Sequence, residues 1–177
     1  MYFVKIPKER IGVLIGPEGA TRKQIEDRSG IKVSIDSNSG DVCLEEEKAK
    51  DPVLILKVRD IVKAIARGFS PERAFVLFGD DFYFDSIDIR EYSGKEQKDV
   101  MRLKGRIIGK HGKTREIIEH LGGAEVSVYG STVSIIADIT SMEVARNAVE
   151  MLLKGSEHSS VYRYLEKKCK KMRKIEL

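Results

Sequence analysis

The chain has 177 residues, of which 41% are hydrophobic and 34% are charged, so it can bury folded cores and extensive disorder is excluded. Its length suits two modules of roughly 80–95 residues each. The 32 Lys and Arg residues outnumber the 28 Asp and Glu residues, and the net charge of +4 mildly favours a polyanionic partner.

Several classes of protein are excluded by the sequence. No apolar stretch reaches the roughly 20 residues that a membrane-spanning helix needs, and residues 1–7 are predicted to form a strand rather than a signal peptide. Cys43 and Cys169 form no CxxC pair, so we expect neither a disulfide framework nor a thiolate zinc site. We therefore expect a cytoplasmic protein without membrane contact.

The first half of the chain is predicted to follow the order β-α-α-β-β-α. Alternating apolar residues indicate strands, a Gly-x-x-Gly segment separates the first two helices, and Gly30 follows the second helix at the position of a left-handed cap. The predicted elements are a strand at 2–6, a helical turn at 13–15, the loop Gly16–Gly19, a helix at 20–29, and strands at 32–35 and 41–45.

A third helix closes this first half. Asp51 and Pro52 are predicted to be its N-cap and first residue, and Gly68 to end it. The apolar residues at helical spacing are Leu54, Val58, Ile61 and Ile65. The acidic run Glu45–Glu47 is predicted to be a solvated loop rather than a metal site.

A short connector helix comes next, with Ser70 as its N-cap and Pro71 at the first helical position. With this connector included, the first domain is predicted to span residues 1–80 and the second residues 81–177.

The second half repeats the pattern of the first. With a shift of 93 residues, segment 12–36 aligns with segment 105–129, and 11 of the 25 positions are identical. Such self-similarity indicates duplication of one structural module. The identical pairs are Gly12/Gly105, Ile15/Ile108, Gly16/Gly109, Gly19/Gly112, Thr21/Thr114, Arg22/Arg115, Ile25/Ile118, Glu26/Glu119, Gly30/Gly123, Val33/Val126 and Ser34/Ser127.

The corresponding elements of the second half end in a helix that Ser141 is predicted to cap, with Val144, Ala148, Met151 and Leu152 on one face. Before that helix, the predicted elements are a strand at 82–89, a helical turn at 107–108, the loop Gly109–Gly112, a helix at 113–121, and strands at 125–128 and 132–137.

A last helix is predicted over residues 161–174. Its apolar stripe consists of Val161, Leu165, Cys169 and Met172, and its other face is rich in Lys and Arg. Two roles are open for it: a helix docked on the domain with a soluble outer face, or an additional surface that contacts phosphates.

This element order, together with Gly105-Arg-Ile-Ile-Gly-Lys-His-Gly-Lys-Thr, resembles a type I KH domain, and Gly12–Gly19 resembles a diverged copy. The resemblance implies an α+β fold of two tandem KH domains, each with a three-stranded antiparallel sheet packed on helices, followed by the C-terminal helix. It also implies binding of single-stranded RNA.

The chemistry of the second loop fits that expectation. Two glycines let a sugar-phosphate chain approach the backbone, and the helix that starts at the loop turns its free N–H groups and positive dipole end towards phosphates. KH modules clamp about four nucleotides in this way. The resemblance implies that Gly105, Ile108 and Arg115 line the groove for the bases and that Gly109–Gly112 grip the backbone. The predicted RNA-binding residues are Gly105, Arg106, Ile108, Gly109, Lys110, His111, Gly112, Lys113 and Arg115.

The first loop has different chemistry. Pro17 removes a backbone donor, and the carboxylate of Glu18 would repel a phosphate by on the order of 1 kcal/mol. We therefore predict that the first loop is a poor phosphate clamp, and that the first domain supports the second or binds a protein.

No catalytic residues, cofactor or metal ligands are predicted. Gly112-Lys113-Thr114 resembles the end of a P-loop, but Ile107 stands where that motif needs its first glycine, which disfavours a nucleotide-dependent enzyme. His111, His120 and His158 share no metal-ligand spacing and are expected to be exposed to solvent.

The segment Ala64–Ala74, next to one diverged and one well-formed KH unit, resembles the archaeal Pno/Dim-type ribosome-assembly factors. That resemblance implies binding near the 3′ end of small-subunit ribosomal RNA, cooperation with a Nob-type endonuclease, and contact with the alpha subunit of translation initiation factor two. The alternative is another KH-type RNA-binding protein, associated with the exosome or regulating transcripts.

Overall fold

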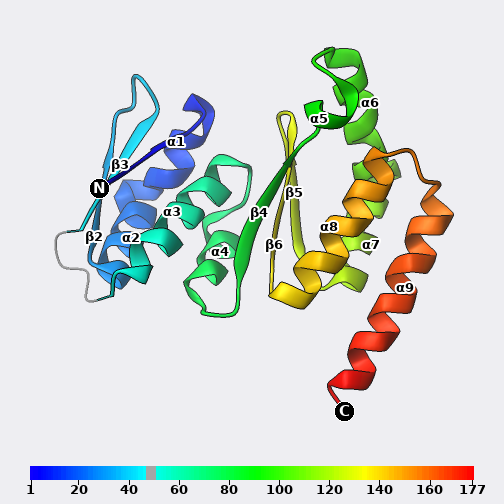
Figure 1. The fold of residues 1–177 in the computed structure, drawn as a ribbon. Coiled ribbons are helices and arrows are strands. Elements are labelled where there is room, and N and C mark those ends of the chain that lie inside the picture. The colour runs from blue at the N-terminus through cyan, green and yellow to red at the C-terminus, as the bar shows by residue number, and fades with distance from the viewer. Residues whose placement is uncertain (47–50) are drawn as a thin grey trace. The chain divides into compact units, whose positions relative to one another are not determined.

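Two three-stranded antiparallel sheets organise the described part of the chain, residues 1–46 and 51–177 of a computed structural model. The chain divides into two units, Met1–Asp80 and Asp81–Leu177, and each unit has one sheet with helices packed against one of its faces (Figure 1). The predicted α+β class with two β-α-α-β-β-α modules is confirmed.

The first unit has a sheet of order β1-β3-β2, in which Phe3 pairs with Cys43 and Ser34 pairs with the same residue from the other side. Its core includes apolar residues from the sheet and from its three longer helices, among them Leu14, Ile25 and Ile61. Its elements are β1 (Tyr2–Lys5), α1 (Lys8–Ile15), η1 (Pro17–Gly19), α2 (Ala20–Ser29), β2 (Ile31–Ile35), β3 (Asp41–Glu46), α3 (Val53–Ala66), α4 (Pro71–Ala74) and η2 (Phe75–Phe78).

The second unit has the same strand order, β4-β6-β5. Helices α6, α7 and α8 bury Leu103, Ile118 and Ala148 against Val133 and Ile135 of the central strand. Its elements are β4 (Tyr83–Asp88), α5 (Arg90–Ser93), α6 (Gln97–Ile108), η3 (Lys110–Gly112), α7 (Lys113–Gly122), β5 (Glu125–Tyr129), β6 (Thr132–Ala137), α8 (Ile139–Leu153) and α9 (His158–Ile175).

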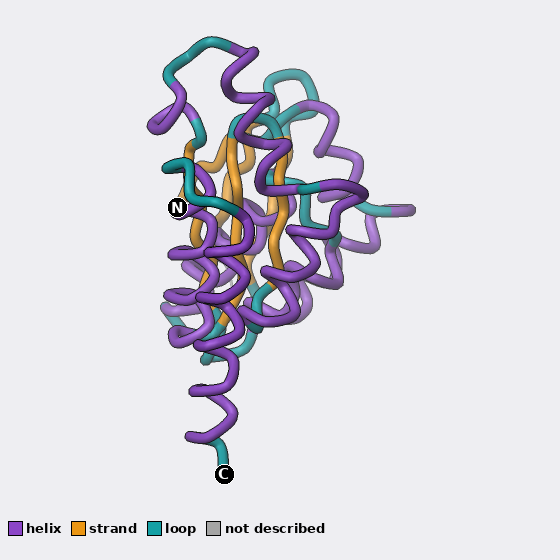
Figure 2. Tube along the Cα trace, turned by 90° about the vertical axis from the view of Figure 1, so that its right-hand side faces the viewer, coloured by secondary structure: helices purple, strands orange, loops and turns teal. Residues whose placement is uncertain are grey.

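Helix α9 is the main addition to the second module. It runs beside α7 and α8, and its C-terminal end projects beyond them (Figure 2). Val161 and Leu165 are fully buried in the core, and Cys169 and Met172 are half-buried, so the predicted apolar stripe is confirmed.

Some sequence predictions at helix ends were wrong. Ser141 is not the N-cap of α8: the carboxylate of Asp138 accepts from the amide of Ser141 at 2.8 Å, and Ser141 lies buried in the first turn. Helix α6 begins ten residues before the predicted turn at 107–108, and α5 was not predicted. Glu45 and Glu46 belong to β3 rather than to a loop, whereas Glu47 lies outside the described residues.

The predicted cap of α4 is confirmed. The hydroxyl of Ser70 accepts from the amide of Arg73, with Pro71 at the first position of α4. The start of α3 was predicted one residue too early: Pro52 is its N-cap and Val53 its first residue, while the carboxylate of Asp51 accepts from the amide of Val53 at 2.9 Å. Among the described residues, no helix has the length and apolar content that crossing a membrane requires.

Candidate nucleic-acid interface

The second Gly-x-x-Gly loop joins α6 to α7 in four residues. Gly109 and Gly112 both have positive φ, at 72° and 75°, which is the region that favours glycine. Between them, His111 is also left-handed, with φ 54°, although it has a side chain. Such a conformation is strained in a non-glycine residue and is concentrated at functional sites.

Thr114 explains why the first of these positions must be glycine. A Cβ added to Gly109 would lie 2.1 Å from Oγ1 of Thr114, because this threonine folds back under the loop and is buried. The hydroxyl of Thr114 shares a hydrogen bond of 2.8 Å with the hydroxyl of Tyr162 on α9. Helix α9 therefore helps to hold the loop in place through this hydrogen bond.

The second glycine, Gly112, faces open space: no atom lies within 4 Å of a Cβ built there. This residue is also the N-cap of α7, and no side chain caps the helix. The N–H groups in the first turn of a helix have no partner inside it, and they carry the positive end of the helix dipole. The loop and the start of α7 thus form a site suited to an anion.

An open face of α6 leads up to the loop. Gly105 is exposed, and no atom lies within 4 Å of a Cβ built at this position. Ile108, three residues later on the same face, is half-buried and leaves an apolar surface next to Gly109. The fold does not fill the space above Gly105, so that space is free for a ligand.

Basic side chains surround this loop. Lys110, His111 and Lys113 are exposed and Arg115 is half-buried. Within the described part of the chain, neither lysine nor Arg115 makes an ion pair. Their charges are therefore available to a polyanion.

Arg106, another residue that we predicted for RNA binding, is placed differently. Its guanidinium donates to the carbonyl of Ser156, in the turn between α8 and α9. Its own carbonyl accepts from Nε2 of His158 at 2.9 Å. Arg106 thus links α6 to the α8–α9 turn and the start of α9, and its predicted contact with RNA stays a prediction. His158 is half-buried rather than exposed as predicted, whereas His111 and His120 are exposed.

Sequence reasoning missed the supporting residues Tyr162 and His158. They lie 48 and 52 residues from their partners Thr114 and Arg106, and no local pattern marks such contacts. Glu119 had a visible signal, because it is one of the repeated residues. Its carboxylate accepts from the amide of Val126 at 2.9 Å and thereby fixes the start of β5 against α7.

The first loop has the same backbone as the second. Gly16 and Gly19 have φ values of 75° and 77°, and Glu18, like His111, is left-handed with φ 53°. Glu26 repeats the bond of Glu119 by accepting from Val33. The two loops therefore differ in side-chain chemistry, with exposed Pro17 and Glu18 in place of Lys110 and His111.

A cleft of about 650 Å³ lies between α2 and β2 in the first unit. Its charged lining residues are mixed in sign: Arg22, Glu26, Asp27 and Lys32.

Among the residues that the structure describes, no group of three or more His, Cys, Asp or Glu side chains is arranged to hold a metal ion.

Comparison with known proteins relates both units to KH domains. Residues 83–170 match the model of the eukaryotic type KH-domain (KH-domain type I) of Pno1, second copy, and residues 1–55 match the general KH domain. A KH domain-containing protein from Methanocaldococcus jannaschii is 46% identical over 97% of this chain and 75% of its own length.

Two further relatives are informative. The pre-rRNA-processing protein pno1 of Schizosaccharomyces pombe is 34% identical over 75% of this chain, which spans 56% of that longer protein. The crystal structure of a complex of a/eIF2alpha, aDim2p and rRNA from Pyrococcus horikoshii contains a chain that is 48% identical, with a TM-score of 0.90 over 96% of this chain and 94% of that one.

Proposed function

Because the chain belongs to the KH-domain family of Pno1- and Dim2-type proteins, we propose that it binds single-stranded RNA through its second unit during ribosome assembly. The RNA segment that we propose is the 3′ region of small-subunit ribosomal RNA. The observation that carries this proposal is the uncapped start of α7 at Gly112, next to the exposed cations Lys110 and Lys113.

The proposed binding mode follows from these positions. Phosphates approach the loop at Gly112, where no side chain intervenes, and the N–H groups of α7 and the nearby cations stabilise their charge. Bases lie against the open face at Gly105 and Ile108, with Arg115 beside them. Glu119 supports this mode by holding β5 in place relative to α7.

The first unit has a different role in this proposal. Its loop has the backbone of a clamp but carries a carboxylate at Glu18, so it supports the second unit or binds a protein rather than gripping phosphates.

The partners extend the proposal further. The Pyrococcus horikoshii complex contains a/eIF2alpha and rRNA, and we propose that this chain likewise contacts ribosomal RNA and the alpha subunit of translation initiation factor two. We add a Nob-type endonuclease as the enzyme that acts on the bound RNA.

We infer a non-catalytic, cytoplasmic role for the chain itself. The hydroxyl of Thr114 supports the non-catalytic part of this inference, because it lies close to Gly109 and is bonded to Tyr162, whereas the hydroxyl of a P-loop Ser or Thr binds magnesium.

Crosslinking in cells tests this function. The chain would be purified with its RNA after irradiation, and the attached RNA ends would be sequenced beside those from a Lys110→Asp, His111→Asp variant. We expect the 3′ ends of small-subunit ribosomal RNA and its precursors to be enriched with the unmodified chain and not with the variant. A broad profile of messenger RNA would contradict the proposal and favour a transcript-regulating protein.

A further inference from the structure

A second binding feature lies along α6, beyond the face at Gly105. It is a pocket of about 380 Å³ between the start of α6, the α5–α6 connection and the β5–β6 turn, and we call it the α6 pocket. Its lining residues are Arg90, Lys95, Gln97, Val100, Met101, Lys104, Gly130 and Ser131.

The α6 pocket continues the open face that leads to the loop. Met101 and Lys104 precede Gly105 and Ile108 by four residues each, and residues four apart lie on one side of a helix. Because a helix rises 1.5 Å per residue, this face runs for about 10 Å from Met101 to Ile108. An RNA chain that runs from the loop along this face of α6 therefore reaches the α6 pocket.

The chemistry of the α6 pocket suits a nucleotide. Three cations line it and no acidic side chain does. Lys95 and Lys104 make no ion pair within the described part of the chain, so their charges are available. Met101 is 64% exposed, and its flexible thioether is a good surface for an aromatic ring.

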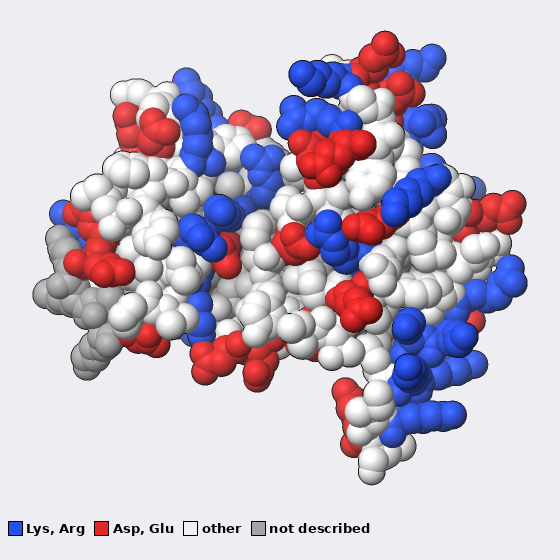
Figure 3. All heavy atoms as spheres, viewed as in Figure 1, with Lys and Arg blue, Asp and Glu red and all other residues white. Residues whose placement is uncertain are grey.

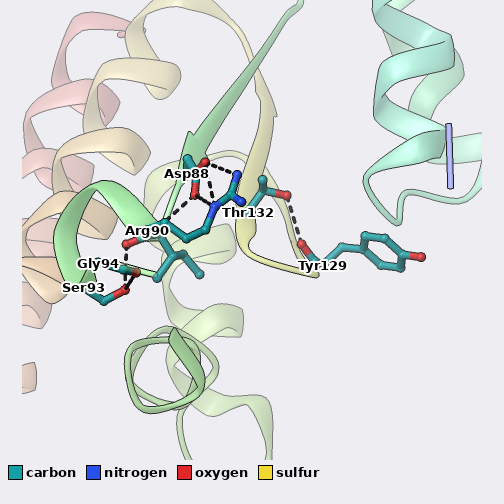
Figure 4. Close-up of polar contacts among 7 residues, drawn as sticks. Asp88, Arg90, Ser93, Gly94, Tyr129 and Thr132 are labelled. Atoms are coloured by element: carbon teal, nitrogen blue, oxygen red, sulfur yellow. Dashed lines mark hydrogen bonds and ion pairs between the residues drawn. The ribbon is translucent and has the colours of Figure 1, made fainter. Parts of the chain in front are cut away.

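Hydrogen bonds hold the wall of the pocket in place (Figure 4). The guanidinium of Arg90 is fixed by Asp88 through contacts of 2.7–3.1 Å, which offset its charge but set its orientation. The amide of Ile89 donates to the carbonyl of Ser131 at 2.8 Å and ties the β5–β6 turn to this segment. Thr132 closes the turn by donating to the carbonyl of Tyr129.

The first unit is built differently at the position that corresponds to the α6 pocket. Helix α1 starts at Lys8, which aligns with Met101, so it lacks the first turn of α6. In the described part of the first unit, β1 is followed by α1 with no helix like α5 between them. Among the described residues, α5 and the first turn of α6, which build the pocket, belong to the unit whose loop carries cations.

We propose that the α6 pocket binds a further nucleotide of the same single-stranded RNA, with its phosphate at Lys95 and Lys104 and its base against Met101. This inference rests on the proposed function. It extends the bound stretch beyond the about four nucleotides that a KH clamp holds.

An RNA length series tests the α6 pocket. The dissociation constants of a short unpaired RNA of about four nucleotides and of one about twice as long would be measured for the unmodified chain, Lys95→Glu and Met101→Ala. Both substituted side chains are exposed, so neither change removes core packing. We expect the unmodified chain to bind the longer RNA at least about tenfold more tightly and each variant to lose most of that gain, with affinity for the short RNA unchanged.

Lys154→Glu is the matched control, because it makes the same charge change at an exposed residue outside the pocket, and it should keep the gain. An unmodified chain that binds the short RNA but gains nothing from the longer one would overturn the α6 pocket alone. Pocket variants that keep the full gain in affinity for the longer RNA would also overturn the α6 pocket alone. Failure of the unmodified chain to bind either RNA would overturn the proposed function as well.

Discussion

At the scale of single residues, the repeated positions separate into structural and functional groups. Ile25/Ile118 and Val33/Val126 are buried in the two cores, Glu26/Glu119 each hold a strand amide, and Gly30/Gly123 are left-handed caps. The fold itself explains these identities.

Other repeated positions have no such explanation. Arg22 and Arg115 make no ion pair within the described residues, and the space beside Gly12 and Gly105 is empty. An unfilled space and an unpaired guanidinium, kept in both copies, point to a binding surface inherited from one ancestral module.

Gly105 allows function and stability to be separated. Glycine inside a helix is less stable than alanine by about 0.5–1 kcal/mol, and a Cβ at Gly105 meets no neighbour. We therefore expect Gly105→Ala to raise the free energy of unfolding by about that amount, while RNA affinity falls on the order of tenfold because the methyl group occupies the RNA face.

Gly12→Ala is the matched control for this change, since Gly12 holds the same position in the first unit and is equally open. It should give a similar gain in chemical denaturation and leave RNA binding unchanged. Equal losses of RNA affinity in the two variants would show that both units bind RNA.

At the scale of elements, the sequence predicted best where a pattern is local. The exact bounds of α2 followed from the loop before it and the glycine after it. The full length of α6 was missed, although its signal is present in the sequence: Val100, Leu103 and Ile107 have helical spacing and are buried. The cap of α8 was misplaced because Asp138 and Ser141 are both good capping residues, and only the folded geometry decides between them.

The support of the loop by α9 belongs to this scale too, and no sequence pattern predicted it. Tyr162→Phe removes the hydrogen bond to Thr114 but keeps the ring. We expect the free energy of unfolding to fall by about 1 kcal/mol, and RNA affinity to fall severalfold because the loop loses its fixed position.

Tyr164→Phe provides the comparison on the same helix, because the hydroxyl of Tyr164 accepts from Asn147 rather than from the loop. It should lower stability to a similar extent and leave RNA affinity unchanged. Thermal unfolding and RNA titration of both variants would check this, and a parallel loss of affinity in Tyr164→Phe would refute a specific role for Tyr162.

At the scale of the whole molecule, the distribution of charge matters more than the small net charge of +4. Lys and Arg side chains gather over the C-terminal part of α9 (Figure 3). Lys167, Lys170, Lys171 and Lys174 are exposed there, while the inner face of the helix is docked. The structure thus establishes the docked face, and binding of phosphates by the outer face stays a prediction.

Salt dependence tests that prediction. Lys167→Gln with Lys171→Gln should make the plot of log affinity against log salt shallower by about 0.7 for each phosphate that the variant no longer neutralises. The same change at exposed Lys23 and Lys63 of the first unit should leave the slope unaltered. An unchanged slope in the α9 variant would assign this helix a structural role alone.

The division of labour between the two loops underlies the whole proposal, and a binding titration is its sharpest test. A labelled unpaired oligoribonucleotide would be titrated by fluorescence anisotropy with the unmodified chain, with Lys110→Asp plus His111→Asp, and with Pro17→Lys plus Glu18→Lys. All four substituted residues are exposed, and circular dichroism would verify folding. We predict that the second-loop variant loses binding and that the first-loop variant binds as tightly as the unmodified chain or more tightly. Undiminished binding by the folded second-loop variant would contradict this division.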